Sequence, residues 1–423
     1  MSWRAILPEE LAARALTSAE EIAADLRRAL TSAPDRPQPL PLNRTRFALA
    51  GGLSGQALFF AYLDRARPGQ GYDETAVELI ELAFDDLGGA DATPGLYSGF
   101  AGAAWVVEHL RGDLIDTEGE DTGAEIAAHL SRLAGVSPWP LGYDLVSGIV
   151  GIGTYAAERL PRPMGRECLE GAVARLAESA ERSPRGTAWW TSPEKMSVLA
   201  RSTNPAGLYD LGVAHGIPGV IALLGQACAR GIAAEEARPL LRGAVSWLLA
   251  HQNPPGSLCR FPTQIVPGEE GRPSRVAWCY GDLGIAAALL VAARGAGEPD
   301  WERAAIELAR RTAAWPAEDS GVVDAGLCHG ATGNGHLFNR LFQQTGDPLL
   351  GRVAREWFAR ALAMKRPGEG IGGFRALVPN AQLERVWHDD PSFLTGAAGM
   401  GLALLAAATD IEPAWDRVLL ISG

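Results

Sequence analysis

Two cysteines and two histidines of this 423-residue chain stand at matching positions of a short repeated motif. His215, Cys279, Cys328 and His329 each lie one or two residues before a glycine that opens an apolar, helix-like run. Two thiolates and an imidazole form a ligand set that suits zinc, and three protein ligands leave a fourth position for water or substrate. A helix N-terminus also favours ionised thiols. The register predicts a zinc site with an open position.

A cysteine followed by histidine at one helix start is by itself usually structural. The shared register of three consecutive copies favours a metal site instead. Cys168 and Cys228 lack that register and are predicted to be buried helix residues, whereas Cys259, in a loop, is an alternative ligand. The remaining histidines are expected to be ordinary helix residues or to lie out of register: His109, His129, His251, His336 and His388.

The motif occurs seven times along the chain. Its anchor glycines are Gly55, Gly99, Gly148, Gly216, Gly281, Gly330 and Gly396. A second glycine follows three residues later in every copy except the first, which has Leu58. Glycine within a helix costs about 1 kcal/mol relative to alanine. We expect the repeated pair to let neighbouring helices approach closely at a barrel axis.

Charged, amphipathic segments lie between the apolar runs. Their alternation predicts an all-α protein, an α/α toroid of seven inner and outer helix pairs forming a single domain over residues 1–423. Three extended, proline-rich pieces near Trp189, Cys259 and Phe374 interrupt the pattern, each shortly before a motif. They are expected to be loops or hairpins at the mouth of the barrel, lining a groove for an extended peptide.

Composition narrows the functional classes. A formal net charge of −12 argues against nucleic-acid binding, which needs a basic face. No apolar run reaches 18 residues, so no transmembrane segment is predicted. The first 30 residues carry acidic side chains and are typical of an amphipathic helix rather than a signal peptide. A cytoplasmic location is expected, with a peripheral place at the membrane within a biosynthetic complex left open.

The sequences WCYG, LCHG and AHGIPG around these residues resemble the lanthionine synthetase C-like family. The resemblance covers nearly the whole chain and implies an α/α toroid with one zinc ion held by Cys279, Cys328 and His329. It also implies site roles for four further residues: His215 as acid/base, with Asp144, Arg275 and Tyr280. One departure is CYGDLG, where Leu283 replaces the proline of the family's CYGxPG.

The resemblance implies a zinc-dependent cyclase of a dehydrated precursor peptide. The zinc-bound thiolate of a substrate cysteine would add to dehydroalanine or dehydrobutyrine, and an acid would protonate the α-carbon of the enolate. Neither a phosphate-binding GxxxxGK[ST] loop nor a glycine loop with the full kinase spacing GxGxxGxV is present. Dehydration of serine and threonine is therefore expected from a separate lanthipeptide dehydratase as partner.

Three other functions fit parts of this pattern. A toroidal glycosidase or epimerase needs paired carboxylates and no metal, which the Cys-Cys-His register disfavours. A protein prenyltransferase subunit also combines a helical toroid with zinc and thiol activation, but its motifs differ. A non-catalytic glutathione- or peptide-binding relative would keep the zinc ligands, and the sequence distinguishes it poorly.

Overall fold

The computed structural model describes residues 2–32, 45–88, 92–115, 121, 123–196, 198–380 and 384–423. The chain groups into two compact units. The first unit comprises Met1–Thr93, Tyr97–Asp121 and Val322–Trp415. The second comprises Pro94–Leu96, Thr122–Gly321 and Asp416–Gly423. Helices dominate both units, and strands occur as short two-stranded pairings.

The first unit contains one hairpin and these helices: α1 (Glu9–Ser32), α2 (Leu53–Ala66), α3 (Tyr72–Gly88), α4 (Phe100–His109), α13 (Ala331–Thr345), α14 (Pro348–Ala363) and α15 (Ala397–Ala408). Its hairpin pairs β5 (Ala376–Pro379) with β6 (Arg385–His388) in antiparallel register. A 3₁₀ turn, Ala414–Leu419, begins at the end of this unit.

The second unit contains these helices: α5 (Ala124–Ala134), α6 (Ile149–Arg159), α7 (Gly165–Ser179), α8 (Val198–Thr203), α9 (Ile217–Ala229), α10 (Ala234–Leu249), α11 (Asp282–Ala296) and α12 (Pro299–Ala313). Its antiparallel pairs are β1 (Glu181–Ser183) with β2 (Gly186–Ala188), and β3 (Tyr209–Asp210) with β4 (Gln264–Ile265). Short 3₁₀ turns cover Pro193–Lys195 and Ala317–Asp319.

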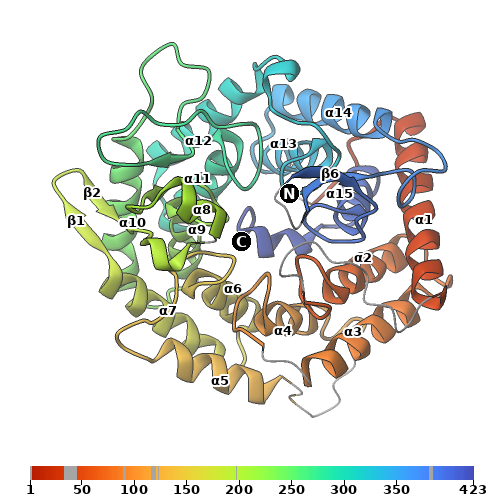
Figure 1. Ribbon diagram of the computed structural model, residues 1–423, viewed down its shortest axis with the longest axis horizontal. Coiled ribbons are helices and arrows are strands. Elements are labelled where there is room, and N and C mark those ends of the chain that lie inside the picture. Colours follow the sequence, from red (N-terminus) through yellow and green to blue (C-terminus); the bar gives the residue numbers. More distant parts are fainter. Residues whose placement is uncertain are drawn as a thin grey trace. The chain divides into compact units, whose positions relative to one another are not determined.

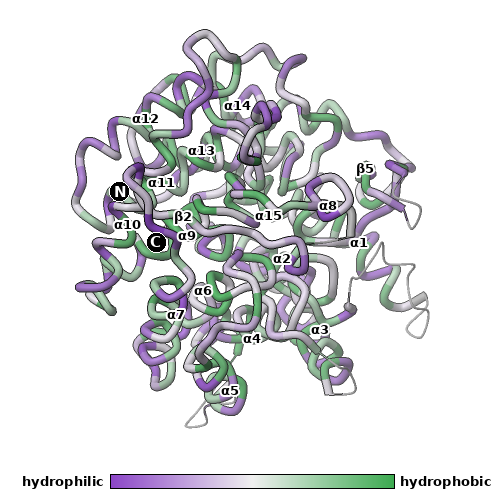
Figure 2. Tube along the Cα trace, turned by 60° about the vertical axis from the view of Figure 1, so that its left-hand side comes forward, coloured by the Kyte–Doolittle hydropathy of each residue, from purple (hydrophilic) through white to green (hydrophobic). Residues whose placement is uncertain are grey.

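Helices of two kinds alternate along the chain, as the sequence predicts. Those that begin at a motif (α2, α4, α6, α9, α11, α13 and α15) are buried over most of their length. The intervening helices bury one face only, and hydrophilic and hydrophobic residues alternate along α5 in Figure 2. Each motif helix from α9 to α13 packs against the helix that follows it, such as α13 against α14 in Figure 1.

The N-terminal helix supplies the outer partner of the last motif helix. α1 packs against α15, and the Trp3 indole N–H donates to the Ala406 carbonyl oxygen at 2.8 Å. The backbone N–H of Ile6 donates to the Ala407 carbonyl oxygen at 3.0 Å. The predicted amphipathic N-terminal helix is therefore confirmed, and it completes the final pair within the first unit.

We call the six residues before the anchor glycine the motif loop, and this loop forms a closed turn before α2, α4, α6, α13 and α15. The first helical N–H bonds back to the carbonyl at the start of this loop, as in Ile149 to Gly142 at 3.1 Å and Ala397 to Asp390 at 2.8 Å. The loop thereby satisfies an N–H group that would otherwise lack a partner at the helix start.

This loop is the reason for the glycine pairs. A Cβ on Gly148 would lie less than 3.0 Å from the Gly142 carbonyl oxygen, and one on Gly151 equally close to that of Leu145. The nearest obstacle is thus the glycine's own motif loop. Close approach to a neighbouring repeat, as expected from the sequence, is a second constraint, because a Cβ on Gly151 would also lie less than 3.0 Å from the Leu96 side chain. Such an approach also occurs elsewhere, where Gly225 of α9 meets Ala292 of α11.

The first motif copy has a different register from the one the sequence predicts. Gly52, rather than Gly55, precedes α2. A Cβ on Gly52 would meet the Arg46 carbonyl oxygen, and one on Gly55 would meet that of Leu49, each six residues upstream as in the other copies. Gly52 is therefore the anchor and Gly55 the second glycine, so this copy is complete. None of the described helices is both long enough and apolar enough to cross a membrane.

Candidate functional site

An aspartate–histidine pair joins the motif loops that precede α6 and α9 in the second unit. Asp144 Oδ2 and His215 Nδ1 are 2.8 Å apart. Asp144 Oδ1 accepts from the Ser147 backbone N–H at 2.8 Å and from its hydroxyl at 3.1 Å, which fixes the carboxylate. The His215 side chain is 45% exposed. The carboxylate binds Nδ1, so Nε2 is the nitrogen that can meet a substrate.

The surroundings of His215 favour its charged form. Burial alone lowers its pKa, but the hydrogen bond to Asp144 and the charges of Asp144, Asp210 and Cys279 outweigh that effect and raise the pKa to about 9. The imidazole is therefore protonated at neutral pH. In this state it can donate a proton, which is what an acid catalyst must do.

A second carboxylate, Asp210, lies beside this pair, and the sequence reasoning missed it. Asp210 is buried, and its Oδ2 accepts from the Tyr280 hydroxyl at 2.8 Å. Burial raises the pKa of Asp210 to about 6, against the opposing effects of His215, the Gly212 N–H and the Tyr280 hydroxyl. Its signal in the sequence is an aspartate six residues before the anchor glycine, repeated as Asp324 and Asp390.

Tyr280 connects Asp210 to the histidine. Its ring stacks on that of His215 with centroids 6.4 Å apart and an interplanar angle of 28°. Burial, together with the charge of Asp210, raises the pKa of Tyr280 well above its ordinary value. The hydroxyl hydrogen is donated to Asp210, so Tyr280 is held in place as a neutral phenol.

Arg275 occupies the first position of the motif loop that leads to Cys279 and Tyr280, where Asp210 stands in the preceding copy. Its side chain is half-buried and lies beside Gly321. Among the described residues, no hydrogen bond or ion pair of its guanidinium is found. The structure therefore brings Asp144, His215 and Tyr280 together in the second unit, but it shows no contact of Arg275 with them.

The cysteines and histidine predicted as metal ligands lie in motif loops. Cys279 is buried in the second unit, and its charge contributes to the raised pKa of His215. Cys328 and His329 precede α13 in the first unit, where the Cys328 N–H donates to the Leu394 carbonyl oxygen at 2.7 Å. Within the described part of the chain, no hydrogen-bond partner reaches the buried His329 Nδ1.

A buried imidazole nitrogen without a hydrogen bond is costly unless a ligand satisfies it. His329 therefore fits the part of a metal ligand, and thiols with an imidazole are the donors that zinc prefers. Cys328 interacts electrostatically with Tyr97. Burial, together with the charge of Cys328, raises the pKa of the Tyr97 hydroxyl well above its ordinary value.

The remaining cysteines differ from these two. Cys168 in α7 and Cys228 in α9 are buried helix residues, as predicted. Burial raises the pKa of Cys168 to about 12, with a smaller opposing effect of Arg159, so this thiol is unreactive at neutral pH. Cys259 accepts a hydrogen bond from the Asn253 side-chain amide at 3.3 Å, which gives its sulfur a structural contact.

The extended pieces lie beside motif loops. The Thr191 N–H donates to the Leu208 carbonyl oxygen at 2.8 Å, and the Leu211 N–H to that of Thr263 at 3.0 Å. The pieces near Trp189 and Cys259 therefore flank the segment that leads to His215. In the first unit, the Leu377 N–H donates to Asp324 Oδ2 at 3.1 Å, next to the Cys328 loop. The groove itself stays a prediction.

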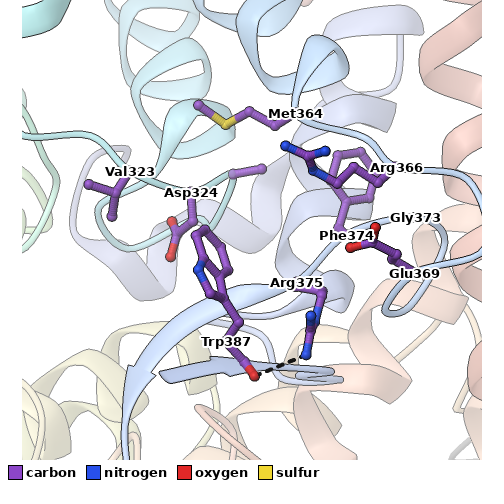
Figure 3. A pocket seen from close by; sticks show the side chains of 10 residues that line it. Val323, Asp324, Met364, Arg366, Glu369, Gly373, Phe374, Arg375 and Trp387 are labelled. Carbon is purple, nitrogen blue, oxygen red and sulfur yellow. Dashed lines mark hydrogen bonds between the residues drawn. The ribbon is translucent and has the colours of Figure 1, made fainter. Parts of the chain in front are cut away.

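A pocket of about 310 Å³ opens in the first unit between the Cys328 motif loop, the segment after α14 and the β5–β6 hairpin (Figure 3). Its apolar lining includes Met364, Phe374 and the exposed Trp387. Arg375 donates to the Trp387 carbonyl oxygen at 3.2 Å, which holds the hairpin side of the pocket (Figure 3).

The alternation of buried motif helices and one-sided helices defines an α/α toroid, and comparison with solved structures confirms this fold class. The structure titled "Nisin cyclase" matches with a TM-score of 0.74 and 19% identity, over 95% of this chain and 96% of that one. "Crystal structure of D-mannose isomerase" (TM-score 0.41, 12% identity, 61% and 75% of the two chains) carries no conclusion here. The structure of cellobiose 2-epimerase from Bacillus thermoamylovorans B4167 (TM-score 0.46, 10% identity, 92% of this chain and 98% of that one) carries no conclusion either.

The family follows from the sequence. The family model for lanthionine synthetase C-like protein matches residues 44–420. The chain belongs to this family, which confirms the resemblance inferred from the motifs.

Proposed function

We propose that the protein is a zinc-dependent cyclase that adds the cysteine thiols of a dehydrated precursor peptide across dehydroalanine or dehydrobutyrine, forming thioether rings. Membership of the lanthionine synthetase C-like family supports this function, as does the shared fold with a protein titled nisin cyclase. The observation that carries it is the pairing of a protonated His215 with Asp144 in the unit that holds Cys279.

The proposed ligands of one zinc ion per chain are Cys279, Cys328 and His329. Their donor types fit zinc, and the buried His329 Nδ1 needs a partner. Bound zinc would supply Lewis acidity that favours the thiolate of a substrate cysteine at neutral pH while leaving its sulfur nucleophilic.

Proton delivery falls to His215. When the substrate sulfur bonds to the β-carbon, the electron pair of the C=C bond moves toward the α-carbon and its carbonyl, giving an enolate. The His215 Nε2–H then protonates the α-carbon. The proton lost by the thiol balances the one gained by carbon, so the addition needs no oxidant or reductant. A pKa of about 9 keeps His215 in the donating form.

The other site residues take supporting roles. Asp144 fixes the Nδ1–H tautomer and stabilises the imidazolium. The Tyr280 hydroxyl donates its hydrogen bond to Asp210 and is not available to the enolate, so the role of Tyr280 in this proposal is to position the imidazole. Arg275 is proposed to stabilise the enolate oxygen, because its guanidinium carries the one charge of suitable sign among these three residues.

The proposal includes a partner and a location. A separate lanthipeptide dehydratase would supply the dehydrated precursor, since this chain lacks the motifs for phosphorylating serine or threonine. Both enzymes would act in the cytoplasm, where the precursor is made, or at the membrane periphery within one complex.

Ring closure on a defined peptide tests the function. A synthetic peptide with one cysteine and one dehydroalanine, incubated with zinc-loaded protein, should lose its free thiol without a change in mass. Tandem mass spectrometry should then show a ring, formed with a single α-carbon configuration. Cys279→Ala should abolish this activity, whereas Cys228→Ala, which changes a buried helix cysteine, should not. Binding of the peptide without ring closure would contradict the cyclase function.

A further inference from the structure

One buried carboxylate ties together two motif loops of the second unit. Asp210 Oδ1 accepts from the Gly212 backbone N–H at 2.8 Å, within the loop that ends in His215. Asp210 Oδ2 accepts from the hydroxyl of Tyr280, in the next motif loop, at 2.8 Å. Each oxygen therefore serves a different loop, and the side chain bridges the segment carrying His215 to the segment carrying Cys279.

The parts that Asp210 holds fit closely against each other. A Cβ on Gly212 would lie less than 3.0 Å from the Cys279 carbonyl oxygen and from the Tyr280 ring, so only glycine leaves room there. The Tyr280 ring also stacks on the imidazole of His215. Tyr280 is thus packed between Asp210 and His215, and its placement depends on the Asp210 oxygen that receives its hydroxyl.

Two other motif loops show which part of this arrangement is general. Asp324 and Asp390 stand in the same slot, and the Oδ1 of each accepts from the N–H two residues on, at 3.1 and 3.0 Å. Their Oδ2 atoms bind the Leu377 N–H and the Thr395 hydroxyl instead. The Oδ1 bond therefore builds the loop in all three of these copies, whereas the Oδ2 bond to Tyr280 is particular to Asp210.

We propose that Asp210 is a positioning residue of the cyclase reaction, which acts through Tyr280 to hold the His215 imidazole in its working orientation next to Cys279. This inference rests on the proposed function, in which His215 protonates the enolate. It assigns Asp210 no contact with the peptide.

Charge adds to the geometric effect. The groups facing His215 are Asp144 from the α6 loop, Asp210 from β3, and Cys279 with Tyr280 from the α11 loop. The pKa of Asp210 is about 6, so this carboxylate is ionised throughout the range in which His215 titrates. It adds a second negative charge that favours the imidazolium.

The test compares Asp210→Asn with the matched variant Asp390→Asn. Asparagine keeps an oxygen that can accept the loop N–H in both places, so both variants should fold and retain zinc. With the dehydroalanine peptide, Asp210→Asn should lower kcat about 10–100-fold with little change in KM, because a misplaced proton donor slows chemistry rather than binding. Its activity should also fall at a lower pH than that of the wild type, by about one unit. Asp390→Asn should resemble the wild type.

Tyr280→Phe and an NMR titration complete the test. The phenylalanine variant keeps the Asp210–Gly212 bond but loses the bond to Oδ2, so it should share the kcat loss even if Asp210→Asn folds poorly. Labelled histidine, with the His215 signal assigned from its absence in His215→Asn, reports the titration without any substrate. A wild-type kcat in Tyr280→Phe, or the same His215 titration in Asp210→Asn as in Asp390→Asn, would overturn the proposal. Failure of the wild type to close any ring would instead count against the proposed function and leave the NMR comparison valid.

Discussion

At the scale of single residues, the candidate site is a set of carboxylates arranged around one imidazole. A lone histidine with ordinary surroundings would be mostly neutral at pH 7. Asp144, Asp210 and Cys279 together raise the pKa of His215 to about 9 against the opposing effect of partial desolvation. The sequence places His215 next to the cysteine-bearing motifs, and the structure adds the reason it can act as an acid.

The pH dependence of ring closure should reflect this acid. His215 donates only when protonated, so the rate should be highest below the pKa of about 9 and fall as the pH rises through it. Asp144→Asn removes both the hydrogen bond and the charge that raise this pKa, and should move the alkaline limb lower by about one unit or more. Rates measured from pH 6.5 to 10 with the dehydroalanine peptide provide the check. An unchanged alkaline limb in Asp144→Asn would assign that limb to another group.

Replacing His215 separates acid catalysis from metal binding. His215→Asn should retain zinc, because the proposed ligands are three other residues, yet close rings at least about 100-fold more slowly. Metal analysis and ring closure on one protein preparation give both readings. Loss of zinc would make His215 a ligand, and a wild-type rate with one α-carbon configuration would leave it without a catalytic role.

At the scale of elements, the motif loop explains both what the sequence predicts and where prediction failed. Periodicity revealed the motif helices and their number, since buried runs following small residues are a local signal. It could not show that the glycines pack against their own loop. The group that they contact is a backbone carbonyl six residues upstream, and every residue type has this group, so the sequence carries no sign of the contact. For the same reason, the sequence-based prediction placed the first anchor glycine at Gly55 instead of Gly52.

The site was predictable to a similar degree. Cys279, Cys328, His329 and His215 stand out because their side-chain chemistry is rare at those positions. Asp210 did not stand out, since aspartates are common in turns and its importance comes from a contact with Tyr280, 70 residues away. Contacts between loops of different repeats are set by packing, which a single sequence does not reveal.

The corrected register makes a stability prediction. Gly55→Ala should destabilise the protein by about 1–3 kcal/mol, because the new Cβ would collide with the Leu49 carbonyl oxygen and the Phe393 side chain. Gly88→Ala, at the end of α3 where a Cβ meets nothing within 4 Å, is the matched control and should change stability little. Thermal unfolding of both variants measures the difference. Equal melting temperatures of the two variants would show that the motif loop does not require glycine at position 55.

At the scale of the whole chain, the N-terminal segment packs against helices that lie more than 300 residues further along the sequence, within the first unit. Trp3 is buried against α15, and Arg340 of α13 lies over its ring at 4.5 Å. Trp3→Ala should therefore cost about 3–5 kcal/mol of unfolding free energy. Trp387→Ala, which removes a 48% exposed indole, should cost far less. Denaturant titrations of the two variants compare the same chemical change in opposite environments, and equal midpoints would contradict the role given to the N-terminal segment.

The proposed zinc ligands Cys279, Cys328 and His329 would share one ion, which allows a prediction about stability. A metal that binds only the folded chain stabilises it in proportion to RT ln(1 + [L]/Kd), so at 1,000 times its Kd zinc should add about 4 kcal/mol. Chelation should therefore lower the melting temperature of the wild type by several degrees. The Cys279→Ala and Cys328→Ala variants should melt near the chelated wild type and respond little to chelator, because each lacks one of the three proposed ligands. A large chelator effect that persists in Cys279→Ala would mean that zinc is held without this cysteine, and Cys279 would then lose its place in the ligand set.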